Sequence, residues 1–292
     1  MRASIQTFEA FRKLHERFFV LPDAWDIMSA VLIEHCGYPA VSTTSVGLGF
    51  ALGCPGDTAI SKDEMIKAVA QICSFVTIGV AVDLESGYAD TPGGVEQVVG
   101  EVIEAGAVGV ALEDSDGIPG KALRPAEEHA ERIRAARRAA ERAGVPLYIN
   151  GRTDPFWIND GVADEIKMRE AIRRSEIYLA AGADGMFISG YKAIPGPVIA
   201  QMVAAIKAPF STLTSTNGPS VAEFERLGVR RLHPGSLPTR ALWGMLESAF
   251  VALRERGDLS QFNQNAPATR DINQVLRPLW QARAKKTGGH AQ

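Results

Sequence analysis

Cysteine is scarce in this sequence of 292 residues. The three cysteines are Cys36, Cys54 and Cys73, and no two of them form a CxxC pair. An odd number without close pairs argues against a disulfide framework. It fits a reducing compartment, so we expect a cytoplasmic protein.

The sequence also lacks long hydrophobic runs and an excess of either charge. No run approaches the ~18 apolar residues that a membrane-spanning helix needs. Residues 1–19 mix polar and apolar side chains, so we expect no signal peptide. The net charge is -3, and positive residues are mostly interspersed with negative ones. We therefore expect neither a membrane nor a nucleic acid as a partner.

Apolar residues make up 46% of the chain and gather in short runs. Each run is followed by a longer amphipathic stretch. Runs of four to eight residues bounded by turn residues indicate strands buried on both faces. The eight runs are residues 18–22, 40–44, 76–83, 107–114, 146–150, 185–189, 209–213 and 229–233.

The stretches between the runs have helical patterns. Ser61 precedes one of them, and Glu64 follows three residues later, which matches a capping box. Several of these stretches end at a glycine. Eight strand–helix units predict a closed (β/α)8 TIM-type barrel. The alternative is an open doubly wound sheet, but no GxGxxG turn follows the first strand.

The alternation stops near residue 257. We assign residues 1–257 to the barrel and residues 258–292 to a polar linker, an extra helix at 269–284 and a disordered tail from residue 287. The extra helix carries apolar residues that need a surface to cover. That surface belongs either to its own barrel or to a neighbouring subunit.

Carboxylates follow two neighbouring strands, and an arginine follows the next. Asp83 and Glu85 come after one strand, Glu113 ends another, and Arg152 follows the strand at 146–150. The chemistry of such barrels sits at these strand ends. Hard oxygen ligands without thiolates suit Mg²⁺, with Mn²⁺ as the alternative. An arginine fork suits a substrate carboxylate, so a small 2-oxo or 2-hydroxy acid is indicated.

Several phrases, in this order, resemble the isocitrate lyase/phosphoenolpyruvate mutase superfamily. They are "LPDAWDIMSAVLIEHCGYPAVSTTS", "LGCPGD", "VDLESGYAD", "AGAVGVALED", "NGRTD" and "AGADGMFISG". The resemblance covers roughly residues 18–240. It implies a (β/α)8 barrel, a Mg²⁺ site and a small carboxylic acid substrate. It also implies a homo-oligomer, a dimer or more usually a tetramer, with C-terminal helices exchanged between subunits.

The resemblance also assigns roles to particular residues. It implies that Asp83, Glu85 and Glu113 form the metal site and that Arg152 holds the substrate carboxylate. Asp57 falls on the family's aspartate in the loop after the second strand, and is our candidate acid/base. The substrate-binding residues that it implies, besides Asp83 and Arg152, are Thr44, Ser45 and Val46.

The sequence departs from the family in two places. Isocitrate and methylisocitrate lyases carry a Lys-Lys/Arg-Cys-Gly-His segment after the fourth strand, and residues 113–129 contain no such segment. Phosphonomutases carry an asparagine and a histidine where a gapless alignment places Lys121 and Ile188. Lys121 is our second candidate for the catalytic acid/base.

The leading hypothesis is a Mg²⁺-dependent lyase. It would cleave a C–C bond next to a carboxylate through a metal-bound enolate of a small 2-oxo acid. The alternatives are a decarboxylase or hydrolase of an oxaloacetate-like acid, and a phosphonate-processing enzyme that acts on a C–P bond. A hypothesis of another class is a catalytically silent 2-oxo-acid-binding protein.

Overall fold

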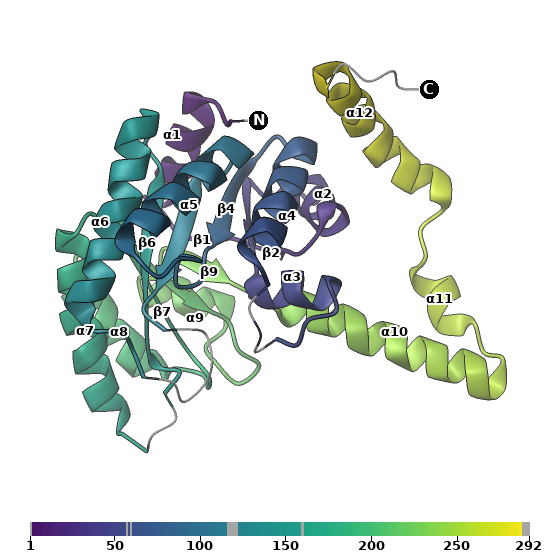
Figure 1. Ribbon diagram of the computed structural model, residues 1–292. Coiled ribbons are helices and arrows are strands. Elements are labelled where there is room, and N and C mark those ends of the chain that lie inside the picture. The colour runs from purple at the N-terminus through teal and green to yellow at the C-terminus, as the bar shows by residue number, and fades with distance from the viewer. Residues whose placement is uncertain (1, 57, 59, 116–121, 159–160, 288–292) are drawn as a thin grey trace.

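Parallel strands line the centre of the molecule and helices surround them (Figure 1). The computed structural model describes residues 2–56, 58, 60–115, 122–158 and 161–287. The first barrel strand has two parts, β1 (Phe19–Val20) and β2 (Asp23–Ala24). The remaining strands are β3 (Ala40–Thr43), β4 (Gly79–Asp83), β5 (Gly109–Glu113), β6 (Tyr148–Phe156), β7 (Gly185–Gly190), β8 (Phe210–Leu213) and β9 (Arg231–His233).

The two parts of the first strand close the barrel. β1 pairs with β9 and β2 pairs with β3, both in parallel. The Leu21 amide donates to the Leu232 carbonyl at 2.9 Å, while the Ser42 amide donates to the Pro22 carbonyl at 2.8 Å. The last strand is therefore joined to the second through the first. The predicted (β/α)8 barrel is confirmed, and the open doubly wound sheet is excluded.

Helices follow the strands and cover the outside of the barrel (Figure 1). They are α2 (Ile27–His35), α4 (Lys62–Phe75), α5 (Pro92–Ala105), α6 (Ala126–Ala143), α7 (Asp164–Ala180), α8 (Gly196–Ala205) and α9 (Val221–Arg226). α1 (Ile5–Leu14) precedes the first strand. A short helix that the sequence did not predict, α3 (Ser45–Ala51), follows β3 directly and brings its first residues to the barrel mouth.

Local signals in the sequence explain where helices begin and end. The Glu64 amide donates to the Ser61 hydroxyl at 3.3 Å, and the Ser61 amide donates to the Glu64 carboxylate at 2.9 Å, so the capping box is confirmed. α5 ends at Gly106, whose φ of 113° lies in the left-handed region that glycine tolerates best.

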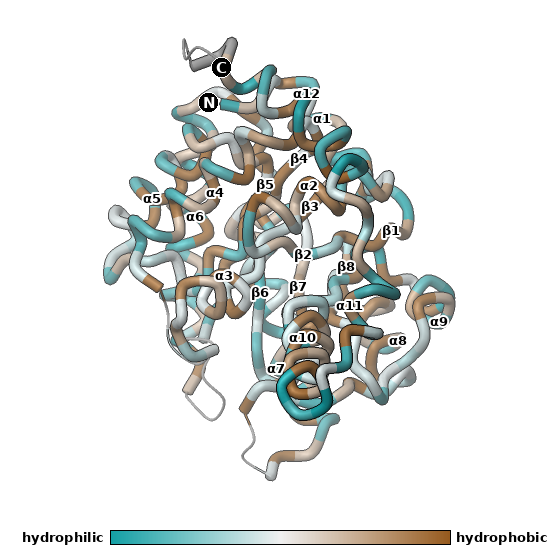
Figure 2. The backbone as a smooth tube through the Cα atoms, turned by 90° about the vertical axis from the view of Figure 1, so that its right-hand side faces the viewer, coloured by the Kyte–Doolittle hydropathy of each residue, from teal (hydrophilic) through white to brown (hydrophobic). Residues whose placement is uncertain are grey.

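The core lies between the strands and the covering helices, and hydrophobic strand segments run inside the ring of helices (Figure 2). Both faces of β5 and β6 are buried, as predicted for strands enclosed on two sides. β6 is longer than the predicted run at 146–150. Arg152 lies within the strand and pairs with Phe187 of β7, and after a register shift between Thr153 and Phe156 the pairing resumes at Gly190.

Three helices follow the barrel, and the first of them extends away from it (Figure 1). They are α10 (Leu237–Arg256), α11 (Ser260–Asn265) and α12 (Thr269–Thr287). α10 exposes large apolar side chains, and Trp243 is 71% exposed. α12 meets α4, where the rings of Trp280 and Phe75 lie 6.3 Å apart. Residues 288–292, most of the tail expected to be disordered, lie outside the described residues.

No described helix has the length and apolar character that crossing a bilayer requires. The division of the chain at residue 257 and the exchange of C-terminal helices between subunits stay predictions.

Candidate functional site

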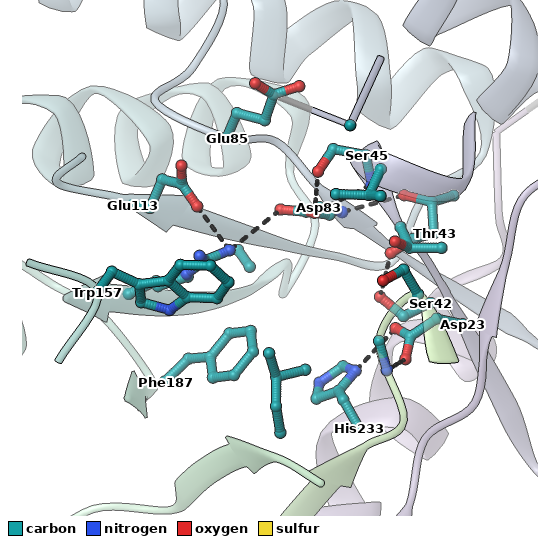
Figure 3. A pocket seen from close by; sticks show the side chains of 18 of the residues that line it. Asp23, Ser42, Thr43, Ser45, Asp83, Glu85, Glu113, Trp157, Phe187 and His233 are labelled. Carbon is teal, nitrogen blue, oxygen red and sulfur yellow. Dashed lines mark hydrogen bonds and ion pairs between the residues drawn. The ribbon is translucent and has the colours of Figure 1, made fainter. Parts of the chain in front are cut away.

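The carboxyl ends of the strands open into one cavity of about 280 Å³ (Figure 3). Its position agrees with the end of the barrel at which such proteins carry their chemistry. Most of the candidate residues from the sequence line it, together with several that were not predicted. Its lining includes Asp23, Thr43, Thr44, Ser45, Val46, Asp83, Glu85, Glu113, Arg152, Trp157, Phe187, Leu213, Arg231 and His233.

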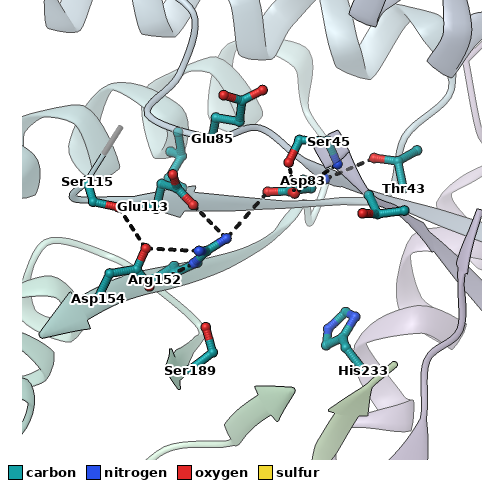
Figure 4. Close-up of polar contacts among 12 residues, drawn as sticks. Thr43, Ser45, Asp83, Glu85, Glu113, Ser115, Arg152, Asp154, Ser189 and His233 are labelled. Atoms are coloured by element: carbon teal, nitrogen blue, oxygen red, sulfur yellow. Dashed lines mark hydrogen bonds and ion pairs between the residues drawn. The ribbon is translucent and has the colours of Figure 1, made fainter. Parts of the chain in front are cut away.

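Arg152 lies among three carboxylates (Figure 4). Its Nε and Nη2 both donate to Asp154, each at 2.9 Å. Its Nη1 lies 2.6 Å from Glu113 Oε2 and 3.9 Å from Asp83 Oδ1. Asp154 thus occupies the Nε–Nη2 edge of the guanidinium, and Nη1 faces Glu113 and Asp83.

Two aromatic rings also hold Arg152 in place. Its guanidinium carbon lies 5.7 Å from the centre of the Trp157 ring and 5.3 Å from that of Phe187. These distances are typical of cation–π contacts. The Trp157 indole is fixed in turn, because its Nε1 donates to the Ser189 hydroxyl at 2.9 Å.

Burial perturbs the charges of this cluster. It raises the pKa of Glu113 well above its usual value, an effect that the Arg152 guanidinium offsets only in part. Burial also raises the pKa of Asp154, again against the effect of Arg152. Burial alone would lower the pKa of Arg152, but the carboxylates outweigh it and the pKa is raised. One guanidinium thus serves three carboxyl groups, two of which burial drives towards their neutral forms.

Two carboxylate oxygens at the cavity are buried and have no hydrogen-bond partner among the residues that the structure describes. They are Oδ1 of Asp83 and Oε1 of Glu113. The other oxygen of Asp83 accepts from the Ser45 amide at 3.1 Å and from the Ser45 hydroxyl at 2.8 Å. Buried carboxylate oxygens normally have a partner. Two such oxygens beside one cavity therefore fit a hard cation such as Mg²⁺.

Glu85 is placed differently from the other two predicted metal ligands. Figure 4 shows that its carboxylate lies apart from those of Asp83 and Glu113. The Tyr88 hydroxyl donates a hydrogen bond to the Glu85 carboxylate. Both Glu85 and Tyr88 have positive φ angles, 45° and 51°, which are uncommon for residues other than glycine. Within the described ranges, no three His, Cys, Asp or Glu side chains gather into a ready-made metal cluster.

Asp114 has a structural role behind the cavity. It accepts hydrogen bonds from the Thr153 hydroxyl at 2.6 Å and from the Asp154 amide at 3.1 Å. From α7, Arg174 donates to it at 3.0 Å and the Tyr178 hydroxyl at 2.7 Å. These bonds hold the backbone of β6 on both sides of Thr153, next to Arg152.

A buried polar chain at the closing strands was missed in the sequence. The Nδ1 of His233 lies 2.9 Å from Asp23, and the Nε of Arg231 donates to the other ring nitrogen at 2.8 Å. The phrase "VRRLH" contained a signal for it. Alternate residues of a strand point to the same face, so Arg231 and His233 had to share the barrel interior.

The remaining candidates fall into two groups. Thr44, Ser45 and Val46 lie at the start of α3 and line the cavity, so they are placed where substrate contact is possible. Asp57 and Lys121, the two candidates for the acid/base, lie outside the described residues. The catalytic, metal-binding and substrate-binding roles of all these residues stay predictions.

The family model for phosphoenolpyruvate phosphomutase matches residues 11–254. The chain belongs to the isocitrate lyase/phosphoenolpyruvate mutase superfamily. This superfamily member is 30% identical over 260 residues to an uncharacterized protein of Mycobacterium tuberculosis, covering 88% of this chain and 93% of the relative. It is 27% identical over 268 residues to the 2-methylisocitrate lyase of Bacillus subtilis, covering 85% and 81%.

Solved structures of the superfamily share the fold. A crystal structure of a putative lyase/mutase from Burkholderia cenocepacia superposes with a TM-score of 0.84 and is 31% identical. The similarity covers 92% of this chain and 96% of that one. The relatives of this superfamily member include lyases and mutases, so its family is one of enzymes.

Proposed function

We propose that this protein is a Mg²⁺-dependent lyase that breaks a C–C bond next to a carboxylate, with the enolate of a small 2-oxo acid as the intermediate. One observation carries the proposal. The unpartnered oxygens of Asp83 and Glu113 lie at the same cavity as the guanidinium of Arg152. A cation site and a fixed positive charge side by side suit a small acid with two adjacent oxygen functions.

The proposed metal ligands are Asp83 and Glu113, with Glu85 binding through water. Mg²⁺ usually takes one or two carboxylates and keeps several waters, and Mn²⁺ accepts the same oxygen donors. When bound, the cation would withdraw electron density from the substrate oxygens and favour negative charge next to the carboxylate. Nη1 of Arg152 lies 2.6 Å from Glu113 and is a second positive group beside the proposed metal site.

The protein's own groups would hold and shield the substrate. Arg152 would offer a carboxylate the donors that Asp154 does not take, the second hydrogen of Nη2 and those of Nη1, which also lies 2.6 Å from Glu113. The segment Thr44–Val46 lies across from it and supplies hydroxyl contacts. Trp157 and Phe187 cover the guanidinium and exclude water from it, which strengthens its charge interactions. For the proton transfer our candidate remains Asp57, with Lys121 as the second.

The proposal includes a homo-oligomer, either a dimer or a tetramer. The exposed apolar side chains of α10, among them Trp243 and Phe250, support it, because large exposed apolar patches mark interaction surfaces. A second copy of the chain would cover them, and the exchanged C-terminal helices would supply part of that cover.

The test is turnover of a panel of 2-oxo acids, malate derivatives, oxaloacetate and phosphonopyruvate in the presence of Mg²⁺. Mn²⁺ binding, followed by electron paramagnetic resonance, is measured in parallel for Asp83→Ala. We expect cleavage of a C–C bond in the wild type and at least a tenfold loss of Mn²⁺ affinity in the variant. Asp63→Ala is the control, because the Asp63 side chain is 90% exposed on α4, away from the cavity.

Two outcomes would contradict the proposal. If 2-oxo acids bind in a Mg²⁺-dependent way and no bond is cleaved, the protein is a 2-oxo-acid-binding protein. If Asp83→Ala binds Mn²⁺ as tightly as Asp63→Ala does, the metal assignment is wrong.

A further inference from the structure

The two halves of the cavity differ in chemistry. β4, β5 and β6 are neighbours in the sheet and contribute Asp83, Glu113 and Arg152. β7, β8 and β9 form the next three strands around the barrel. We call the lining residues Trp157, Phe187, Leu213 and His233 the aromatic wall. In Figure 3, Trp157, Phe187 and His233 lie below Asp83 and Glu113.

His233 presents a ring face to the cavity, because both of its ring nitrogens are engaged. Arg231 Nε carries a hydrogen and can only donate, so Nε2 of His233 accepts at 2.8 Å. The proton of the neutral imidazole is then on Nδ1, which donates to Asp23 at 2.9 Å. The ring stacks on Phe187 with 5.1 Å between centroids and 16° between planes.

Arg231 lines the cavity, but its guanidinium nitrogens are occupied by partners within the protein. Its Nη1 lies 3.4 Å from Nε2 of His15, towards the opposite end of the barrel. Its Nη2 donates at 2.6 Å to the side-chain oxygen of Asn150, with that amide oriented to accept. The carboxylate of Asp23, on the other side of His233, offsets the positive charge at the wall.

The other members of the wall offer no hydrogen to a ligand either. The indole Nε1 of Trp157 donates to Ser189 at 2.9 Å, and Phe187 and Leu213 have no polar side-chain atoms. A second carboxylate placed against these four side chains would lose its water without gaining a donor. It would also approach the negative charge of Asp23. Burial of an unpaired carboxylate is strongly unfavourable.

We propose that this cavity takes a 2-oxo acid whose far end is uncharged and apolar, a branched alkyl or aromatic group that lies on the aromatic wall. The 2-oxo carboxylate end rests on the function proposed above, in which Arg152 and the metal site hold it. The far end is selected independently, by the wall. Dicarboxylic 2-oxo acids are therefore poor ligands of this protein.

The experiment compares two stable probes that differ only at the far end. N-isobutyloxamate carries an isopropyl group where N-oxalylglycine carries a carboxylate, and neither contains a bond that a lyase cleaves. Their affinities, and that of oxalate, are measured by titration calorimetry with the full chain and saturating Mg²⁺. We expect N-isobutyloxamate to bind at least about tenfold more tightly than N-oxalylglycine. Leu213→Lys adds a cation to the wall and should reverse this ratio, while Leu213→Met should leave it unchanged.

The outcomes separate the two proposals. If oxalate fails to bind with Mg²⁺, the proposed function fails at the metal and Arg152. If oxalate binds and N-oxalylglycine binds as tightly as N-isobutyloxamate, the function stands and the inference about the wall is overturned. It is also overturned if oxalate binds and neither extended oxamate does, because the wall then contacts no ligand.

Discussion

Replacement of Arg152 by methionine tests the electrostatics of the cluster most directly. The side chains of Asp154 and Glu113 are 0% and 2% exposed, so water cannot replace the guanidinium as their partner. Removal of one member of a buried ion pair costs about 3–5 kcal/mol. Domains are stable by about 5–15 kcal/mol, so Arg152→Met loses a large part of its free energy of unfolding at pH 8.

The loss of unfolding free energy in Arg152→Met should become smaller as the pH falls. The pKa values of Glu113 and Asp154 are raised by burial, and Arg152 lowers them in part. Without Arg152 the folded variant takes up protons at a higher pH than its unfolded chain does. A folded state that binds more protons gains stability as the pH decreases. A neutral carboxyl group also needs no positive partner, so the variant approaches the wild type towards pH 5.5.

Urea denaturation at pH 8 and pH 5.5, with a chelator present, measures both effects. The control is Arg173→Met on α7, where the arginine is 53% exposed and pairs with Glu170. A surface pair contributes about 0–1 kcal/mol, with little dependence on pH in this range. A loss below about 1 kcal/mol for Arg152→Met at pH 8, or a loss that grows at pH 5.5, would refute the account of the cluster.

Two further predictions concern stability and assembly. Burial lowers the pKa of His129 to about 3. As the pH falls, the unfolded chain therefore binds this proton before the folded chain does, and the free energy of unfolding of the wild type decreases by up to ~1.4 kcal/mol per pH unit below ~6.5. His129→Gln keeps a donor for the Leu112 carbonyl, so its free energy of unfolding should decrease by ~2 kcal/mol less than that of the wild type between pH 7.5 and pH 5. Urea denaturation at both pH values measures this, and an equal decrease in the two proteins would contradict it. Trp243→Ser removes an exposed ring from α10 and should shift the sedimentation profile to smaller species, whereas a monomeric wild type would contradict the proposed oligomer.

The sequence predicted the barrel well because its signals are local and repeated. All eight strands lie at or close to the predicted runs, since a run of apolar residues between turns suits a strand buried on both faces. The short helix α3 was missed because "SVGLGFA" contains two glycines and has a weak helical pattern. The extension of β6 was missed because it depends on pairing with β7, which is not a local property.

The site was predictable in its residue types and in part of its contacts. Asp83, Glu113 and Arg152 do meet, because neighbouring parallel strands end at the same edge. Asp154 takes the Nε–Nη2 edge of Arg152, and its position two residues further along the same strand favours this contact because alternate residues share a face. The position of Glu85 depends on the left-handed backbone at that residue, which the sequence favours weakly.

The pairing of the first strand with the last strand has a consequence for the synthesis of the chain. Asp23 meets His233 across 210 positions of sequence, and β1 has β9 as its neighbour. At ~5–20 residues per second, a ribosome needs ~10–40 s to make the chain between them. Throughout that time the first strand keeps an open edge, which is a template for pairing with other chains. Nascent chains that stop before β9 should therefore aggregate more readily than full-length chains.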